Sequence, residues 1–124
     1  MRTWTYVETR EVDQFTVILD WCYEDLDLSY VFEDPEDIKI HAERCNQDID
    51  THYVARVRVF YDGVEMGNSY MGSCYAYGVD PAVDMVEREC GGYLEQMLDE
   101  AMDEARARAV EMLDRLKADF LEAR

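Results

Sequence analysis

Two strand-like runs on either side of Asp62-Gly63 constrain the fold of this chain most strongly. Residues 53–61 alternate between two faces, with Tyr53, Ala55, Val57, Val59 and Tyr61 on one and Arg56 and Arg58 on the other. This alternation is typical of a half-buried β-strand. Asp-Gly after such a run is a strong signal for a tight hairpin turn. We therefore expect a return strand over residues 64–77, with bulges or close packing at Gly67 and Gly72.

A second strand pair is expected near the N-terminus. Residues 3–7 and 15–22 have strand-like sequences, and the polar residues 10–13 between them predict a turn. The following residues 24–34 are acidic with scattered apolar positions, which predicts an irregular and partly ordered loop.

Two Asp-Pro pairs predict helix starts, because Asp34 and Asp80 can cap a helix and proline suits its first position. The first helix is short and ends near Cys45. Gly91-Gly92 interrupts the second, and a long helix starts at Tyr93. An apolar stripe along this helix predicts that it packs on a sheet or another helix; it comprises Leu94, Met97, Leu98, Ala101, Ala105, Ala109, Met112, Leu116 and Phe120.

The expected order of elements is β-β-α-β-β-α. Its simplest packing is a single α+β domain over residues 1–124. In this arrangement an antiparallel sheet of about four strands is packed by a short helix and a long C-terminal helix.

Charge is the strongest clue to function. The chain has 29 Asp and Glu against 12 Lys and Arg, a net charge of −17, and is 48% hydrophobic. This composition favours a folded domain over a disordered acidic tail. Most of the charge lies in residues 20–53 and 80–124, with net charges of −9 and −7. Such a surface repels nucleic acid and anionic membranes, and it attracts basic partners.

The expected compartment is intracellular. No signal peptide is apparent, and no apolar run approaches the roughly 20 residues that span a bilayer. Nothing else suggests secretion, so we expect reduced and mostly buried thiols at Cys22, Cys45, Cys74 and Cys90.

No catalytic motif stands out, and we expect neither enzymatic activity nor a cofactor. Carboxylate pairs are abundant, but they arise by chance in a chain with 29 acids. The best metal candidates are His41 and Cys45, one helical turn apart, which Cys22 or His52 could complete. Because the chain has no C-x-x-C pair, we expect no metal site.

Carboxylates can stand in for nucleic-acid phosphates. Acids at positions i and i+4 of a helix are about 6 Å apart, comparable to the spacing of phosphates along DNA. Glu95, Asp99 and Asp103 have this spacing, and the loop from Asp20 to Asp37 can present a second row. The same spacing would also arise on any solvated acidic helix. The candidate partner-binding residues are Asp25, Asp27, Tyr30, Glu33, Asp34, Glu36 and Asp37, with Glu95, Asp99, Glu100, Asp103 and Glu104.

Three stretches resemble small proteins predicted in phages and prophages. They are residues 25–30 with Asp34-Pro35, residues 57–59 through Asp62-Gly63 to Gly72, and Asp80 with the acidic helix around Tyr93-Leu94. The resemblance implies a phage context, in which small acidic proteins often inhibit host defence. Anti-CRISPR and anti-restriction proteins are similar in size and charge, and several of them are nucleic-acid mimics.

These observations together predict a phage-encoded, non-enzymatic inhibitor in the cytoplasm of a bacterial host cell. Its expected partner is a basic nucleic-acid-binding protein, a CRISPR effector or a restriction enzyme. We expect no direct binding to nucleic acid or membrane.

The alternative is a phage structural or assembly adaptor whose acidity only confers solubility. It would bind through the apolar face of the long helix or through a strand edge. A homodimer is compatible with either function, because Ala101, Ala105 and Ala109 allow two helices to approach closely.

Overall fold

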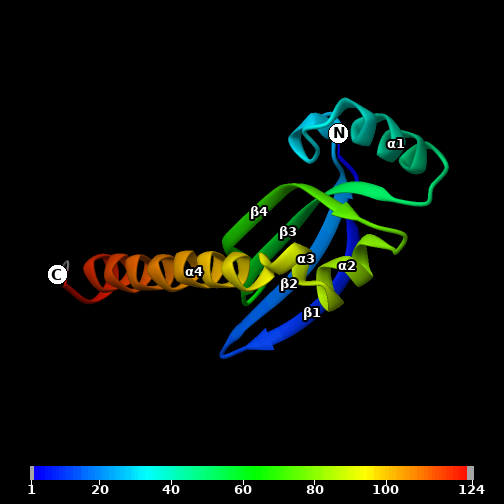
Figure 1. Ribbon diagram of the computed structural model, residues 1–124. Helices are drawn as coiled ribbons and strands as arrows, with labels where there is room; N and C mark the ends of the chain where they lie inside the picture. The colour runs from blue at the N-terminus through cyan, green and yellow to red at the C-terminus, as the bar shows by residue number, and fades with distance from the viewer. Residues whose placement is uncertain (1, 123–124) are drawn as a thin grey trace.

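The computed structural model describes residues 2–122 and contains one antiparallel sheet (Figure 1). Its strands are β1 (Thr5–Val12), β2 (Phe15–Tyr23), β3 (Thr51–Tyr61) and β4 (Val64–Ala76), in the spatial order β1-β2-β3-β4. Each strand pairs with its sequence neighbour, so the sheet is a simple meander. The predicted α+β class and the four strands are confirmed.

The helices lie in two places. The short helix α1 (Pro35–Asn46) follows a single helical turn at Leu28–Tyr30 and lies beyond one end of the strands (Figure 1). By contrast, α2 (Pro81–Glu87), α3 (Glu89–Gly92) and α4 (Leu94–Lys117) follow β4, and α4 packs against β4 and β3. A π-helical turn at Ala118–Glu122 extends α4.

Both predicted helix starts are confirmed. The Asp34 carboxylate accepts a hydrogen bond of 2.9 Å from the Glu36 N–H, and Asp80 accepts one of 2.8 Å from the Ala82 N–H. The interruption near Gly91-Gly92 is also present. Cys90 and Gly91 have φ values of 54° and 73°, which are outside the helical range and separate α2 from α4.

The first strand differs from the prediction. It begins at Thr5 and continues through Val12, so the turn contains only Asp13 and Gln14. Residues 10–12 look like a polar turn in the sequence, but Arg10 pairs with Val17 and Glu11 with Thr16. Because β1 is an edge strand, it can keep polar side chains in solvent while its backbone completes the sheet.

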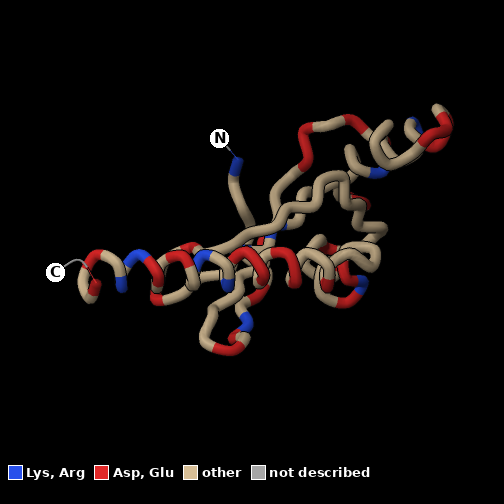
Figure 2. The backbone as a smooth tube through the Cα atoms, turned by 90° about the vertical axis from the view of Figure 1, so that its left-hand side faces the viewer, with Lys and Arg blue, Asp and Glu red and all other residues tan. Residues whose placement is uncertain are grey.

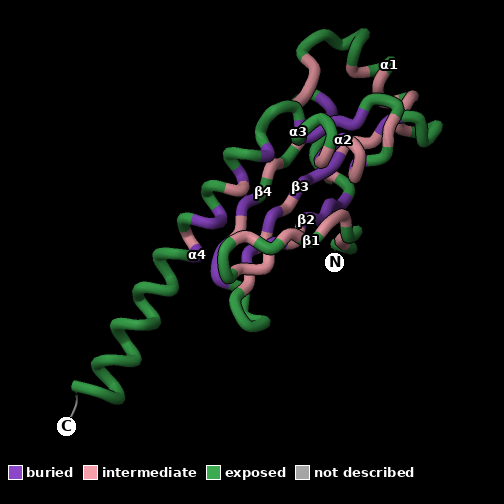
Figure 3. The backbone as a smooth tube through the Cα atoms, turned by 90° about the horizontal axis from the view of Figure 1, so that it is seen from below, coloured by how far each residue is buried: buried purple, intermediate pink, exposed green. Residues whose placement is uncertain are grey.

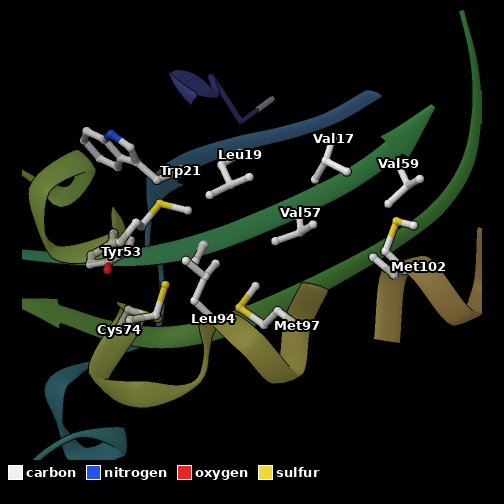
Figure 4. Close-up of a cluster of buried hydrophobic side chains, with 14 of the residues drawn as sticks. Val17, Leu19, Trp21, Tyr53, Val57, Val59, Cys74, Leu94, Met97 and Met102 are labelled. Atoms are coloured by element: carbon white, nitrogen blue, oxygen red, sulfur yellow. The ribbon is translucent and has the colours of Figure 1, made fainter. Parts of the chain in front are cut away.

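The core lies between one face of the sheet and the first half of α4 (Figure 4). Strand residues Leu19, Tyr53 and Val57 meet Leu94 and Met97 from α4, and all five are buried. The core also includes Cys74 and Cys90, and Cys22 is buried elsewhere, so the expectation of mostly buried thiols is confirmed. Although α1 has the predicted boundaries, it contributes no buried residue.

The long helix has two different halves. Proximal α4, residues 94–105, buries Leu94, Met97, Ala101, Met102 and Ala105 against the sheet. Every residue from 106 to 122 is exposed, and this segment projects away from the domain (Figure 3). We call it the distal helix. The predicted packing of Ala109, Met112, Leu116 and Phe120 is therefore wrong for this single chain, because the sheet ends before the helix does.

Candidate functional site

The candidate acidic residues lie on two separate surfaces. One is proximal α4, and the other is the segment from Asp25 to Asp37, which includes the start of α1. Figure 1 shows α1 beyond one end of the strands and proximal α4 alongside β3 and β4, and Figure 2 shows Asp and Glu spread over separate parts of the backbone. A single partner groove would have to span the domain to contact both surfaces.

Proximal α4 presents an exposed row of carboxylates. Glu95, Asp99 and Asp103 are all exposed and are spaced one helical turn apart. The opposite side of the same helix is buried on the sheet, so the backbone that carries the row is held in place. No Lys or Arg occurs between Arg88 and Arg106. We call these three residues the acidic row. Arg106, one turn further along the helix, lies 3.8 Å from Asp103 at the end of the row, whereas Glu95 and Asp99 form no ion pair within residues 2–122.

The two other α4 candidates flank this row. The Glu100 carboxylate accepts hydrogen bonds from the Ser69 hydroxyl at 3.0 Å and from the Gln96 amide at 3.1 Å. Glu104 is half-buried. Because Glu100 is held by Ser69 of β4 and Glu104 is half-buried, both are less free to reach a partner than the acidic row.

On the second surface, residues 25–37, some of the carboxylates already bind other groups of the same chain. Asp27 accepts hydrogen bonds from the Ser29 hydroxyl and N–H, which lower the pKa of Asp27. Asp34 caps α1, and Asp25 lies 3.5 Å from Arg2. Glu33, Glu36 and Asp37 are exposed and form no ion pair within residues 2–122. Tyr30 is 67% exposed and available as an aromatic contact.

A cavity of about 390 Å³ lies between α1, the Tyr23–Leu28 segment and the start of β3. Glu24, Asp27, Cys45 and Asp50 contribute to its lining, as does His52. Burial lowers the pKa of His52, and its Nε2 atom has no hydrogen-bond partner among the described residues. This cavity was not predictable from the sequence, because its walls come from segments that only tertiary packing brings together.

The two residues considered as metal ligands face other groups. The His41 ring stacks on Phe32 at 4.0 Å between centroids, and its Nδ1 lies 2.7 Å from the Asp37 carbonyl. The Cys45 sulfur is 3.6 Å from the Tyr75 hydroxyl. Within residues 2–122, no three His, Cys, Asp or Glu side chains are grouped to hold a metal ion.

Asp50 ties α1 to the sheet. Its buried carboxylate accepts two hydrogen bonds from Arg44, at 2.7 and 3.0 Å. The Tyr75 hydroxyl and the Gly78 N–H add bonds of 2.7 and 2.8 Å. The bonds from Arg44 are the largest cause that lowers the pKa of Asp50, to about 2. Asp50 lies within an acidic block, but its role here is structural.

This pKa predicts a pH-dependent difference between the wild type and Asp50→Asn. A lowered folded-state pKa adds stability above the unfolded pKa of about 4, and this stability is lost as the pH falls towards 2. The wild type should be more stable than Asp50→Asn by about 2 kcal/mol at pH 7, and the difference should nearly vanish at pH 2. Urea unfolding of both proteins across this range measures the difference. A constant difference would contradict the assignment.

Comparison with protein-family models, curated proteins and solved structures gives no match to this chain. No helix within the described residues is long and apolar enough to cross a bilayer.

Proposed function

We propose that this protein is a phage-encoded, non-enzymatic inhibitor that binds the nucleic-acid-binding surface of a bacterial defence protein. The observation that carries the proposal is the acidic row: three exposed carboxylates, one turn apart, on a helix whose other side is buried. A CRISPR effector or a restriction enzyme is the expected target. The second surface, at residues 25–37, would add to the field that attracts the target.

The acidic row suits such a target for physical reasons. Its carboxylates are about 6 Å apart along the helix axis, at 1.5 Å per residue, and a nucleic-acid channel binds phosphates at comparable spacing. A folded helix also cannot be cleaved or copied as a nucleic acid can. Since binding would replace phosphates by carboxylates, affinity should fall steeply as salt screens the charges.

Two charge-reversal variants test this proposal. The first replaces Glu95, Asp99 and Asp103 by lysine, and the second replaces Glu33, Glu36 and Asp37. Both raise the net charge by the same amount. Asp34 is left in place because it caps α1, and its loss would itself cost about 1 kcal/mol. The assay asks how well each protein prevents purified CRISPR effectors and restriction enzymes from binding DNA.

The expected result is inhibition by the wild type that weakens with salt. The first variant should lose at least about tenfold in potency, and the second variant should lose less. Equal losses would indicate that only net charge matters. If the wild type does not prevent DNA binding by any protein of either class, the proposal is wrong.

The adaptor function is the second candidate, and the distal helix favours it. Leu113, Leu116 and Phe120 are exposed there, and an exposed apolar row of this kind often marks a contact with another protein. An adaptor that binds through these apolar residues of the distal helix should keep its partner at high salt and in the presence of DNA. The inhibitor should release its partner under both conditions.

A further inference from the structure

We propose that the distal helix pairs with the distal helix of a second copy of this chain, in an antiparallel two-fold arrangement. Its apolar residues are all substantially exposed; Val110, Met112, Leu113, Leu116, Phe120 and Leu121 are 47–71% accessible. Ala109, Leu113, Leu116 and Phe120 follow one another at steps of four, three and four residues, the spacing of a coiled-coil seam.

The charge of the distal helix fits a second copy. Residues 106–122 contain four Lys or Arg and four Asp or Glu, so this segment is neutral. Residues 1–105 contain seven Lys or Arg and twenty-five Asp or Glu. Two such acidic bodies repel each other. The distal helix is about 25 Å long at 1.5 Å per residue, which exceeds two Debye lengths of about 10 Å at 0.1 M salt. Antiparallel pairing keeps the bodies at opposite ends, whereas parallel pairing places them side by side.

Along one edge of the seam, the charges of one copy are complementary to those of the same edge in an antiparallel second copy. Arg108 and Asp119 are eleven residues apart, about three helical turns. They lie near the same edge, because the wider π-helical turn that starts at Ala118 has advanced by only two residues at Asp119. Neither forms an ion pair with another residue of the described chain. When two helices run in opposite directions, like edges face each other. Arg108 of each copy then lies opposite Asp119 of the other, which gives two equivalent ion pairs.

The base of the distal helix offers a place for the end of the partner helix. Phe15, Tyr61 and Ala109, with Asp13 and Gln14, line a mostly apolar hollow of about 390 Å³. The Phe15 and Tyr61 rings meet edge to face, 6.3 Å between centroids. In the register that pairs Arg108 with Asp119, Phe120 of the second copy lies beside this hollow. Phe120 is 71% exposed in the single chain. The hollow therefore matches an aromatic side chain that only antiparallel pairing brings to it.

This arrangement differs from the homodimer considered from the sequence, in which Ala101, Ala105 and Ala109 would all lie at the helix–helix contact. Ala101 and Ala105 are buried on the sheet and are unavailable, and only Ala109 is exposed. The inference uses residues outside the acidic row, so it is independent of the proposed inhibitor function.

Sedimentation equilibrium of the full chain tests the pairing. The wild type should be a dimer at micromolar concentrations. Phe120→Ala, Arg108→Glu and Asp119→Lys should each weaken the dimer about tenfold or more, because each change acts twice in a two-fold interface. The double variant Arg108→Glu/Asp119→Lys should recover near wild-type dimerisation, because it restores opposite charges across the edge. Circular dichroism verifies that each variant is folded.

Glu111→Lys is the matched control. It changes the net charge as Asp119→Lys does, but it lies on the side of the helix away from the seam, so dimerisation should be unchanged. A wild type that is monomeric at high micromolar concentration overturns the proposal. So does a dimer in which the double variant is no stronger than the single variants.

Discussion

Asp20→Asn is expected to destabilise the domain by about 3–5 kcal/mol, the largest effect of any single change considered. The Asp20 carboxylate lies on the face of the sheet opposite the core and α4, and it is only 5% exposed. It accepts hydrogen bonds from Arg56 Nε at 2.7 Å and from Arg58 Nη2 at 3.0 Å. Trp4 covers the Arg56 guanidinium, which lies 3.7 Å from the ring centroid. Removal of the carboxylate charge leaves Arg56 partly buried without a counter-ion, and leaves Arg58 with only the more exposed Glu65 at 4.0 Å.

Urea unfolding at pH 7 measures this loss as a change in unfolding free energy. Glu65→Gln is a suitable control, because Glu65 lies 4.0 Å from the Arg58 guanidinium and is 41% exposed. An exposed pair of this kind contributes less than about 1 kcal/mol. If Asp20→Asn cost no more than Glu65→Gln, solvent would already be neutralising the arginines, and the network would not be structural.

Gly67→Ala is expected to cost about 3 kcal/mol, because α4 lies directly on the backbone of β4 at this position. A Cβ atom on Gly67 would lie 2.2 Å from the Ala101 carbonyl oxygen and 2.9 Å from the Ala105 nitrogen. Both are backbone atoms in the middle of a helix. They cannot move by a change of rotamer, so the whole helix must shift away from the sheet. Thermal and urea unfolding should both show the loss.

Gly72→Ala provides the comparison within the same strand. The Cβ added at Gly72 would meet only the Glu24 Oε2 atom, at 3.2 Å. The Glu24 carboxylate accepts hydrogen bonds from the Ser73 and Leu26 N–H groups, but as a side-chain end it can shift by a few tenths of an ångström without moving the backbone. The cost should therefore be below about 1 kcal/mol. Equal costs at the two positions would mean that loss of glycine as such, rather than contact with α4, determines stability.

Much of the fold follows from local sequence rules. The Asp62-Gly63 turn has φ values of 49° and 78°, as a tight hairpin turn requires, so the central strand pair was predictable. The two Asp-Pro pairs predicted both helix starts. The first strand was harder to predict, because the charged residues Arg10 and Glu11 beside Asp13 resemble a turn, and only pairing with β2 makes residues 10–12 a strand.

The candidate site was predictable in part. The exposure of Glu95, Asp99 and Asp103 follows from the period of the helix, because Met97 and Ala101 mark the buried side. Sequence reasoning treated Asp20 and Asp50 as members of an acidic block. Both are buried and bind arginines, because strand register brings Arg56 beside Asp20 and the end of α1 brings Arg44 to Asp50.

The sequence by itself determined the element types, the hairpins, the caps and the acidic character, because these depend on residues close together in the chain. Only the tertiary structure decided which acids are free and how much of the apolar stripe is covered. Contact of α4 with the sheet ends near Ala105, and the helix continues to residue 122. The periodic apolar stripe in the sequence specifies that one face of α4 is hydrophobic. The length of the neighbouring sheet determines how much of that face is buried.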